Sequence, residues 1–113
     1  MLQPYQDMSD IEAILEGISI PSDLRHLIPG FIERRQLDVL TLKNLLATQN
    51  YEELKRLGHR LKGHGRGYGF GPITDCGLLI EELSRNRNLD GLSEIIERFE
   101  TYIDLISKNI HRL

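Results

Sequence analysis

Apolar residues recur at steps of three and four along most of this chain, which is the spacing of one buried face of an α-helix. The period is clearest near the C-terminus, in the series Leu92, Ile96, Phe99, Ile103, Ile106 and Ile110. A second series predicts a long helix that ends near Asn50, namely Ile28, Ile32, Val39, Leu42 and Leu46. Pro29 either starts this helix or kinks a longer one. No segment shows the alternation of a β-strand, so the pattern indicates an all-α protein.

Two further helices are predicted in the middle of the chain. If the segment from about Tyr51 to Tyr68 is one helix, its apolar residues share a side: Leu54, Leu57, Leu61 and Tyr68. Pro72 favours the first turn of the next helix, which has its own apolar face made of Ile73, Cys76, Ile80 and Leu83. A polar turn follows, with Asp90 as the expected cap of the last helix. Four amphipathic helices with short connections predict an antiparallel up-down-up-down four-helix bundle.

The bundle is expected to span residues 21–113, with residues 1–20 as an N-terminal extension. In the extension, Ser9 or Asp10 could cap a short helix that runs through Leu15. A flexible tail is the alternative for this segment.

Composition narrows the class of protein. The chain has 113 residues and 40% apolar content with few aromatics, which suits one small helical domain. A net charge of −3 gives no general reason to bind nucleic acid. The single cysteine, Cys76, excludes an internal disulfide and fits a reducing cytoplasm. No apolar run reaches the length of about 18 residues that a membrane helix needs, and no signal peptide begins the chain. We therefore expect a cytoplasmic monomer with no membrane or nucleic-acid partner.

A cluster of glycines surrounds one histidine. Six of the ten glycines lie between Gly58 and Gly71, around His59. On a continuous helix, which turns about 100° per residue, His59 lies opposite the apolar stripe. Lys55, Lys62 and Arg66 lie within about 60° of it on that helix. This arrangement suits a histidine that carries phosphate, because neutral imidazole is a nucleophile and cations offset the charge of a phosphoryl group.

Glycine inside a helix costs about 1 kcal/mol relative to alanine, so these glycines require a reason. Gly63, about one turn beyond His59, would leave space for the surface of another protein. Gly65, at the edge of the apolar stripe, would let a neighbouring helix pack closely. The alternative is that the glycines form a loop and His59 is an ordinary surface residue.

The sequence does not match the other chemical motifs that its glycines and histidines suggest. The spacing from Gly58 to Gly63 matches a phosphate-binding P-loop, but His64 stands where lysine is required. His59 and His64 point about 140° apart on a helix and cannot share a metal ion. The remaining candidates are interpreted as surface or core residues: His26 and His111 at the surface, Glu82 in solvent and Cys76 in the core.

One extended pattern is informative, and it consists of His59-Arg60-Leu61-Lys62-Gly63, then Gly69 and Phe70, then Ile73, Gly77 and Glu81. It resembles the histidine-containing phosphotransfer (HPt) domain of bacterial phosphorelays. The resemblance is weaker in the flanking helices and does not include the first twenty residues. It implies a four-helix bundle whose histidine is phosphorylated on Nε2 and exchanges the group with an aspartate of a response-regulator receiver domain.

The resemblance also implies roles for single residues. His59 matches the phosphoacceptor, Lys62 the contact to the phosphoryl oxygens, and Gly63 the small residue that admits the receiver. Glu81 matches the polar residue that hydrogen-bonds the other imidazole nitrogen, which would leave Nε2 free to attack. Arg85 matches a basic position near the site in some members.

Two further positions, Arg66 and His64, bear on how the phosphoryl group would be held. Arg66 is expected to support Lys62 in holding the phosphoryl oxygens. His64 departs from the family pattern, in which a serine or another small residue is usual, so a hydroxyl contact to phosphate is not expected there.

We therefore expect a phosphoryl carrier without kinase activity of its own. The chain has no acidic cluster for Mg²⁺, so the metal and the acceptor aspartate should come from the receiver. The expected partners are a response-regulator receiver domain, a hybrid histidine kinase, or both. The alternative is an adaptor that is not phosphorylated and binds a partner through the same face. A fragment of a sensor kinase is disfavoured, because no ATP-binding motif is present and the chain looks complete at both ends.

Overall fold

The computed structural model describes residues 8–113, and their side chains from residue 11 onward. Within this range the chain is helical and has no β-strand. The α-helices are α1 (Met8–Glu16), α2 (Ile28–Ala47), α3 (Tyr51–His64), α4 (Gly71–Arg85) and α5 (Leu89–Lys108). Three 3₁₀ turns complete the described chain: η1 (Ser22–Leu27), η2 (Arg66–Tyr68) and η3 (Ile110–Arg112).

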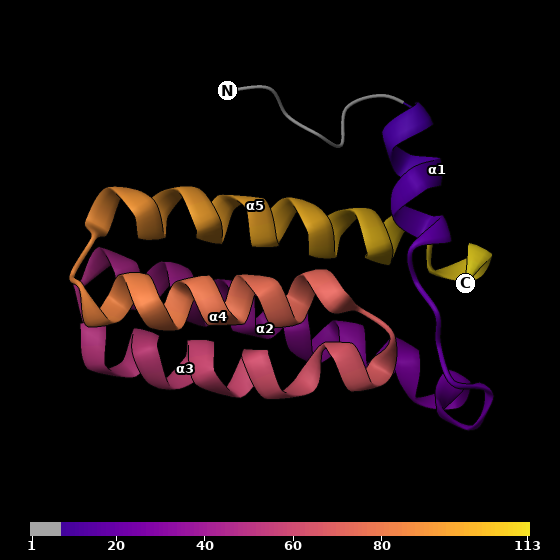
Figure 1. The fold of residues 1–113 in the computed structure, drawn as a ribbon, viewed down its shortest axis with the longest axis horizontal. Coiled ribbons are helices and arrows are strands. Elements are labelled where there is room, and N and C mark those ends of the chain that lie inside the picture. The colour runs from indigo at the N-terminus through magenta and orange to yellow at the C-terminus, as the bar shows by residue number, and fades with distance from the viewer. Residues whose placement is uncertain (1–7) are drawn as a thin grey trace.

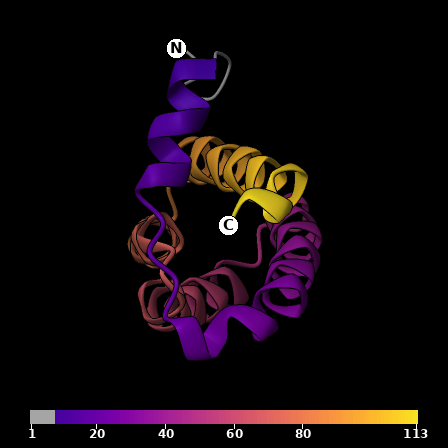
Figure 2. The same ribbon diagram turned by 90° about the vertical axis from the view of Figure 1, so that its right-hand side faces the viewer.

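Helices α2 to α5 form an antiparallel four-helix bundle (Figure 1), so the predicted up-down-up-down topology is confirmed. Viewed along the bundle, they follow one another around a ring in chain order (Figure 2). Helix α3 therefore packs between α2 and α4, and α5 lies diagonally opposite. No helix in the described part of the chain is long and apolar enough to cross a membrane.

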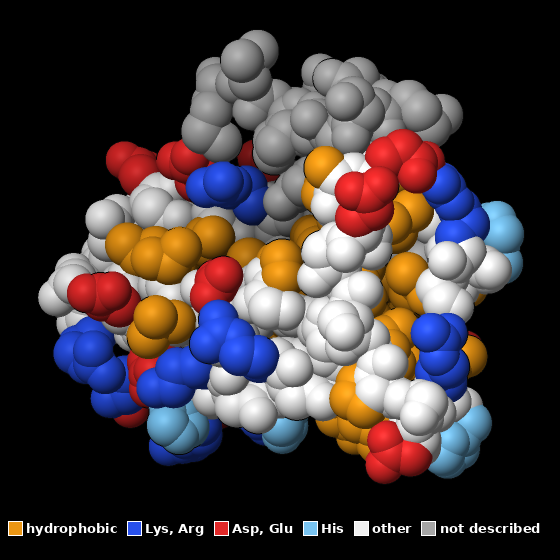
Figure 3. Space-filling model, turned by 45° about the vertical axis from the view of Figure 1, so that its right-hand side comes forward, with side chains coloured by type: hydrophobic (Ala, Val, Ile, Leu, Met, Phe, Trp, Pro, Cys, Tyr) orange, Lys and Arg blue, Asp and Glu red, His pale blue; other side chains and the backbone are white. Residues whose placement is uncertain are grey.

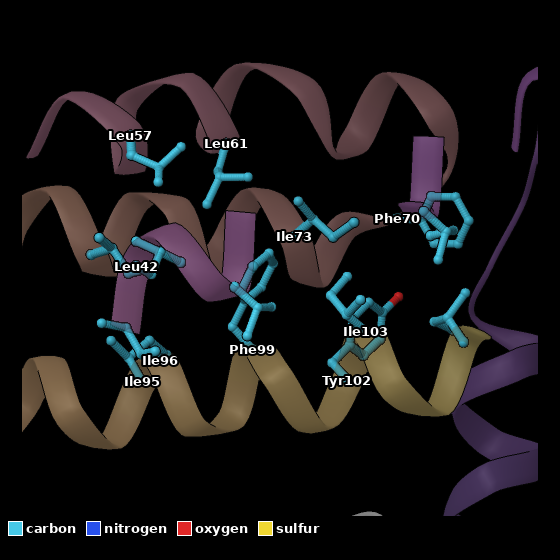
Figure 4. Packing of buried hydrophobic residues seen from close by; sticks show 14 of the residues in the cluster. Leu42, Leu57, Leu61, Phe70, Ile73, Ile95, Ile96, Phe99, Tyr102 and Ile103 are labelled. Atoms are coloured by element: carbon cyan, nitrogen blue, oxygen red, sulfur yellow. The ribbon is translucent and has the colours of Figure 1, made fainter. Parts of the chain in front are cut away.

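The core lies on the bundle axis, where apolar side chains from the four helices meet (Figure 4). Phe31 stacks on Tyr68 and on Phe70, with ring centroids 4.3 Å and 5.6 Å apart. The residues of the predicted stripes are buried or half-buried, including Leu54, Leu57 and Leu61. Periodicity therefore located the core faces correctly, because each helix buries one side.

The α2–α3 and α4–α5 turns are built alike. Gln49 and Arg87 take left-handed backbone conformations, each with φ of 53°. An asparagine follows each of them and caps the next helix: Asn50 Oδ1 accepts from Glu53 N, and Asn88 Oδ1 accepts from Gly91 N. The predicted cap at Asp90 is wrong, because Asn88 already ends the turn and Asp90 lies inside the first turn of α5.

Helix α3 is shorter than predicted. It ends at His64 instead of continuing to Tyr68. The Arg66 amide donates to Thr74 Oγ1 on α4 at 2.8 Å, and Gly69 has a left-handed φ of 96°. A helix cannot continue through these contacts, so the chain forms the tight turn η2 and enters α4.

Before the bundle, α1 lies across the end where α5 finishes (Figure 1). Of the two alternatives for the N-terminal segment, residues 8–16 form the short helix. It begins at Met8, so neither Ser9 nor Asp10 stands at the cap position. Pro29 lies in the first turn of α2 and starts that helix without kinking a longer one. Helix α2 ends at Ala47, slightly before the expected position.

Candidate functional site

His59 projects from α3 on the side away from the core. Its side chain is 67% exposed, whereas Leu57 and Leu61 of the same helix are buried. Histidine and Lys or Arg side chains gather along the lower left of the face in Figure 3, near the edge where Figure 1 places α3. The helical projection was therefore right about the orientation of His59.

Glu81 on α4 contacts two side chains of α3. Its Oε2 lies 2.8 Å from His59 Nδ1, and its Oε1 accepts from Lys62 Nζ at 2.8 Å. An ionised carboxylate can only accept hydrogen bonds, so Nδ1 must carry the proton of the ring. Nε2 then keeps its lone pair, on a ring that is mostly exposed. The structure thus brings together His59, Lys62 and Glu81, the three residues expected to act at one site.

The Glu81 carboxylate is held in its charged form. Its pKa lies below the usual value, chiefly because Lys62 donates a hydrogen bond to it, with a further contribution from His59. Partial burial acts in the opposite direction, since the side chain is only 13% exposed. The carboxylate therefore places negative charge beside the imidazole at neutral pH.

Close packing of α3 on α4 positions these groups. Gly58 and Gly77 are both buried where the two backbones meet. A Cβ at Gly77 would lie 2.7 Å from Gly58 O, and one at Gly58 would lie 2.7 Å from Glu81 N. A larger residue at either position would separate the helices, because backbone atoms form the contact. The structural role of Gly58 was missed from the sequence, although glycine in a helix interior is the signal for such an approach.

Two other glycines behave as the sequence suggested. Gly65 is buried, and a Cβ there would lie 2.6 Å from Thr74 N, which confirms the close approach of the next helix. Gly63 is exposed, and a Cβ there would have no atom within 4 Å. The fold therefore requires Gly65, while nothing within the described chain requires glycine at position 63.

The two remaining basic candidates, Arg85 and Arg66, each lie near a carboxylate of α4. Arg85 Nη2 lies 4.0 Å from Glu81 Oε2, so Arg85 lies beside the site. Arg66 Nη2 pairs with Asp75 Oδ1 at 3.3 Å. The projection that put Arg66 near His59 assumed a helix that in fact ends at His64, so it does not fix the position of this side chain.

A buried ion pair next to the site was not foreseen. Asp38 on α2 is buried and pairs with Arg35, whose Nε lies 2.9 Å from Asp38 Oδ2. Arg60, adjacent to His59, approaches Asp38 from α3, with Nη2 3.7 Å from Oδ1. The spacing of three between Arg35 and Asp38 was the available signal. The cluster links α3 to α2 at the level of His59.

The remaining candidates have structural explanations. His26, His64 and His111 are exposed, as is Glu82. Cys76 packs against the core, and burial raises its pKa to about 11, so it is a poor nucleophile. Among the side chains that the structure describes, no three from His, Cys, Asp or Glu come together in a way that could hold a metal ion.

Comparison with known protein families gives the class of this protein. A family model described as Hpt domain matches residues 26–109, which is most of the chain. The chain therefore belongs to the Hpt domain family. Hpt domains are phosphocarrier modules that interact with kinases and receiver domains, so this protein takes part in phosphorelay phosphotransfer. A search of curated proteins and a search of solved structures each found no significant match.

Proposed function

We propose that this protein accepts a phosphoryl group on Nε2 of His59 and exchanges it with the aspartate of a response-regulator receiver domain. The observation that carries the proposal is the 2.8 Å contact between His59 Nδ1 and Glu81 Oε2 on an otherwise exposed ring. This contact favours the tautomer in which Nε2 is unprotonated, on a ring that is exposed enough for a partner to reach.

In the transfer, the Nε2 lone pair attacks the phosphorus of an aspartyl phosphate. The N–P bond forms, the P–O bond to the aspartate breaks, and the aspartate leaves as a carboxylate. The imidazole keeps its Nδ1 proton and becomes positively charged. The Glu81 carboxylate stabilises that charge through the Nδ1–H hydrogen bond, and the reverse step restores the neutral ring.

Lys62 is suited to hold the phosphoryl oxygens. Its ammonium group has three donors, and Glu81 Oε1 accepts only one of them. The side chain is 35% exposed, so the other donors can reach a group bound to His59. Lys62 would therefore offset the charge that spreads over the phosphoryl oxygens in a loose transition state.

Gly63 would leave space for the receiver to reach His59. Gly63 lies in the last turn of α3, where glycine has a lower helix propensity than alanine, and no packing contact explains it. We propose that the bare backbone admits the receiver surface to His59. Arg85 and Arg66 are assigned supporting roles at the edge of the same surface, where Arg66 is already paired with Asp75.

The partner is proposed to provide Mg²⁺ and the acceptor aspartate, either as a separate response regulator or as the receiver of a hybrid histidine kinase. Mg²⁺ neutralises charge on the transferring group and is usually held by carboxylates. The carboxylate nearest His59, Glu81, is already engaged by His59 and Lys62.

The deciding experiment mixes the protein with a panel of phosphorylated receiver domains and follows phosphate onto it. His59→Gln should abolish the transfer, because it removes the nucleophile, while circular dichroism shows an unchanged helical fold. His64→Gln, which changes an exposed histidine on the same helix, should transfer normally. The adduct should be labile in acid and stable in base.

Two results would count against the proposal. Transfer to His59→Gln at the normal rate would place the phosphate elsewhere. Receivers that bind without transferring phosphate would favour the adaptor function instead.

A further inference from the structure

A basic hollow lies at the end of the bundle where the α2–α3 and α4–α5 turns meet. It has a volume of about 370 Å³ and is lined from both turns and from the adjoining ends of α3 and α4. Three of its lining residues are cations, Lys55, Arg85 and Arg87, and Glu52 is the only anion. This local excess of positive charge contrasts with the net charge of −3 for the whole chain.

The cations of the basic hollow are poorly neutralised within the molecule. Lys55 Nζ lies 3.8 Å from Glu52 Oε1, and Arg85 Nη2 lies 4.0 Å from Glu81 Oε2. The Arg87 guanidinium lies 5.4 Å from the centre of the Tyr51 ring, and no carboxylate pairs with it in the described part of the chain. Such long, exposed pairs contribute little stability. Their donors therefore remain available to an external carboxylate.

The basic hollow adjoins His59. Lys55 precedes His59 by one helical turn, which is about 6 Å along the axis of α3. Arg85 follows Glu81 by one turn on α4 and links the hollow to the site. A protein interface of ordinary size covers about 800 Å² on each partner, or roughly 16 Å around its centre. A partner centred on His59 would therefore also cover the hollow.

We propose that the basic hollow binds acidic side chains at the rim of the receiver that exchanges phosphate with His59, and that it helps select the receiver. This inference rests on the proposed function. A receiver that presents an aspartate with bound Mg²⁺ brings several carboxylates towards His59. Carboxylates at its rim would meet Lys55, Arg85 and Arg87, and arginine can bind them with two parallel hydrogen bonds. Charge pairs at a rim act mainly on the rate of association and weaken in salt.

The test uses the double variant Lys55→Gln with Arg87→Gln. Gln49 already has the same φ as Arg87, so glutamine is compatible with that turn. The control variant, Arg98→Gln with Lys108→Gln, removes the same charge from exposed positions on α5, the helix diagonally opposite α3. One sample of each protein is labelled with phosphoramidate, a small donor that needs no docking. A second, unlabelled sample is mixed with a phosphorylated receiver that transfers to the unmodified protein.

Phosphoramidate should label all three proteins at rates within about twofold. At 50 mM salt, the second-order rate constant for transfer from the receiver should fall about tenfold in the double variant and change less than twofold in the control. The difference should nearly disappear at 500 mM salt.

The outcomes separate the two proposals. If labelling is normal but the double variant matches the control with the receiver, the role of the basic hollow is refuted and the phosphoryl carrier stands. An equal loss in both variants would show an effect of overall charge and would also refute it. If neither phosphoramidate nor any receiver labels the unmodified protein, both proposals fail.

Discussion

At the residue scale, Glu81 divides its carboxylate between two tasks. One oxygen accepts from His59 and sets the tautomer, and the other holds Lys62 close to the same ring. The carboxylate can do both because it is ionised and only partly exposed to water. A residue 22 positions away in the chain thus determines the chemical state of the proposed nucleophile.

This arrangement predicts a pH-dependent contribution to stability. The folded pKa of Glu81 lies below its usual value of about 4.5, so its contribution is complete above that pH and is lost as the pH falls through the folded pKa. Glu81→Gln should lower the free energy of unfolding by about 1 kcal/mol at pH 7. The difference from the unmodified protein should shrink as the pH falls below about 4.5 and through the folded pKa, because the glutamate carboxyl then becomes neutral like the glutamine amide. Urea unfolding at pH 7, 5 and 3 measures it.

Glu82→Gln is the matched control for that experiment. Glu82 is the exposed neighbour of Glu81, so its substitution should change the free energy of unfolding by less than about 0.5 kcal/mol. A loss for Glu81→Gln that is the same at all three pH values would contradict the assignment of an ionised, hydrogen-bonded carboxylate.

At the scale of elements, the site depends on how closely α3 approaches α4. The two helices make backbone contact at Gly58 and Gly77, which lie on either side of the interface. That contact lets the Glu81 side chain span the distance to His59 and Lys62. A bundle with ordinary spacing, about 8 to 10 Å between axes with side chains in between, would hold the carboxylate farther away.

Gly77→Ala should therefore destabilise the protein by about 1 to 3 kcal/mol, because the new Cβ would overlap backbone atoms of α3. Gly63→Ala is the matched comparison, since its Cβ would meet open space. It should stabilise the protein by up to about 1 kcal/mol through helix propensity alone. Denaturant unfolding should show a lower free energy of unfolding for Gly77→Ala and a higher one for Gly63→Ala. A stabilised Gly77→Ala protein would contradict the close backbone contact between α3 and α4.

At the scale of the whole molecule, the N-terminal segment lies before the region that matches the Hpt family model and yet packs on the bundle. Half-buried Ile11, Ile14 and Leu15 of α1 contact the core. Glu12 pairs with Arg112 near the C-terminus, and the Ser19 amide donates to Gly69 O. The segment thus contacts both the C-terminal region and the turn before α4.

Removal of residues 1–20 should lower the free energy of unfolding by about 3 kcal/mol, from the apolar surface it uncovers. The remaining chain should stay helical, and phosphoramidate should still label it, because His59 and its partners all lie in α3 and α4. Thermal unfolding, monitored by circular dichroism, measures the loss of stability. Unchanged stability would contradict the packing of α1, and loss of labelling would show that the extension contributes to the site.

The sequence by itself determined the parts of this protein that depend on local order. Helical periodicity is a property of neighbouring residues, so it located the core faces of α2 to α5 and placed His59 on the outer face of α3. The residue pattern around His59 also led to the family that the comparison confirmed. Local reasoning failed at the helix ends, at Asp90 and beyond His64, where contacts with other elements decide the outcome.

Only the tertiary structure decided what depends on the register between helices. The approach of Glu81 to His59 and Lys62, the crossing of Gly58 over Gly77, and the basic hollow between two separate turns all join residues far apart in the chain. Their positions are set by how the side chains of four helices pack together, and that packing is a property of the whole core rather than of any one segment.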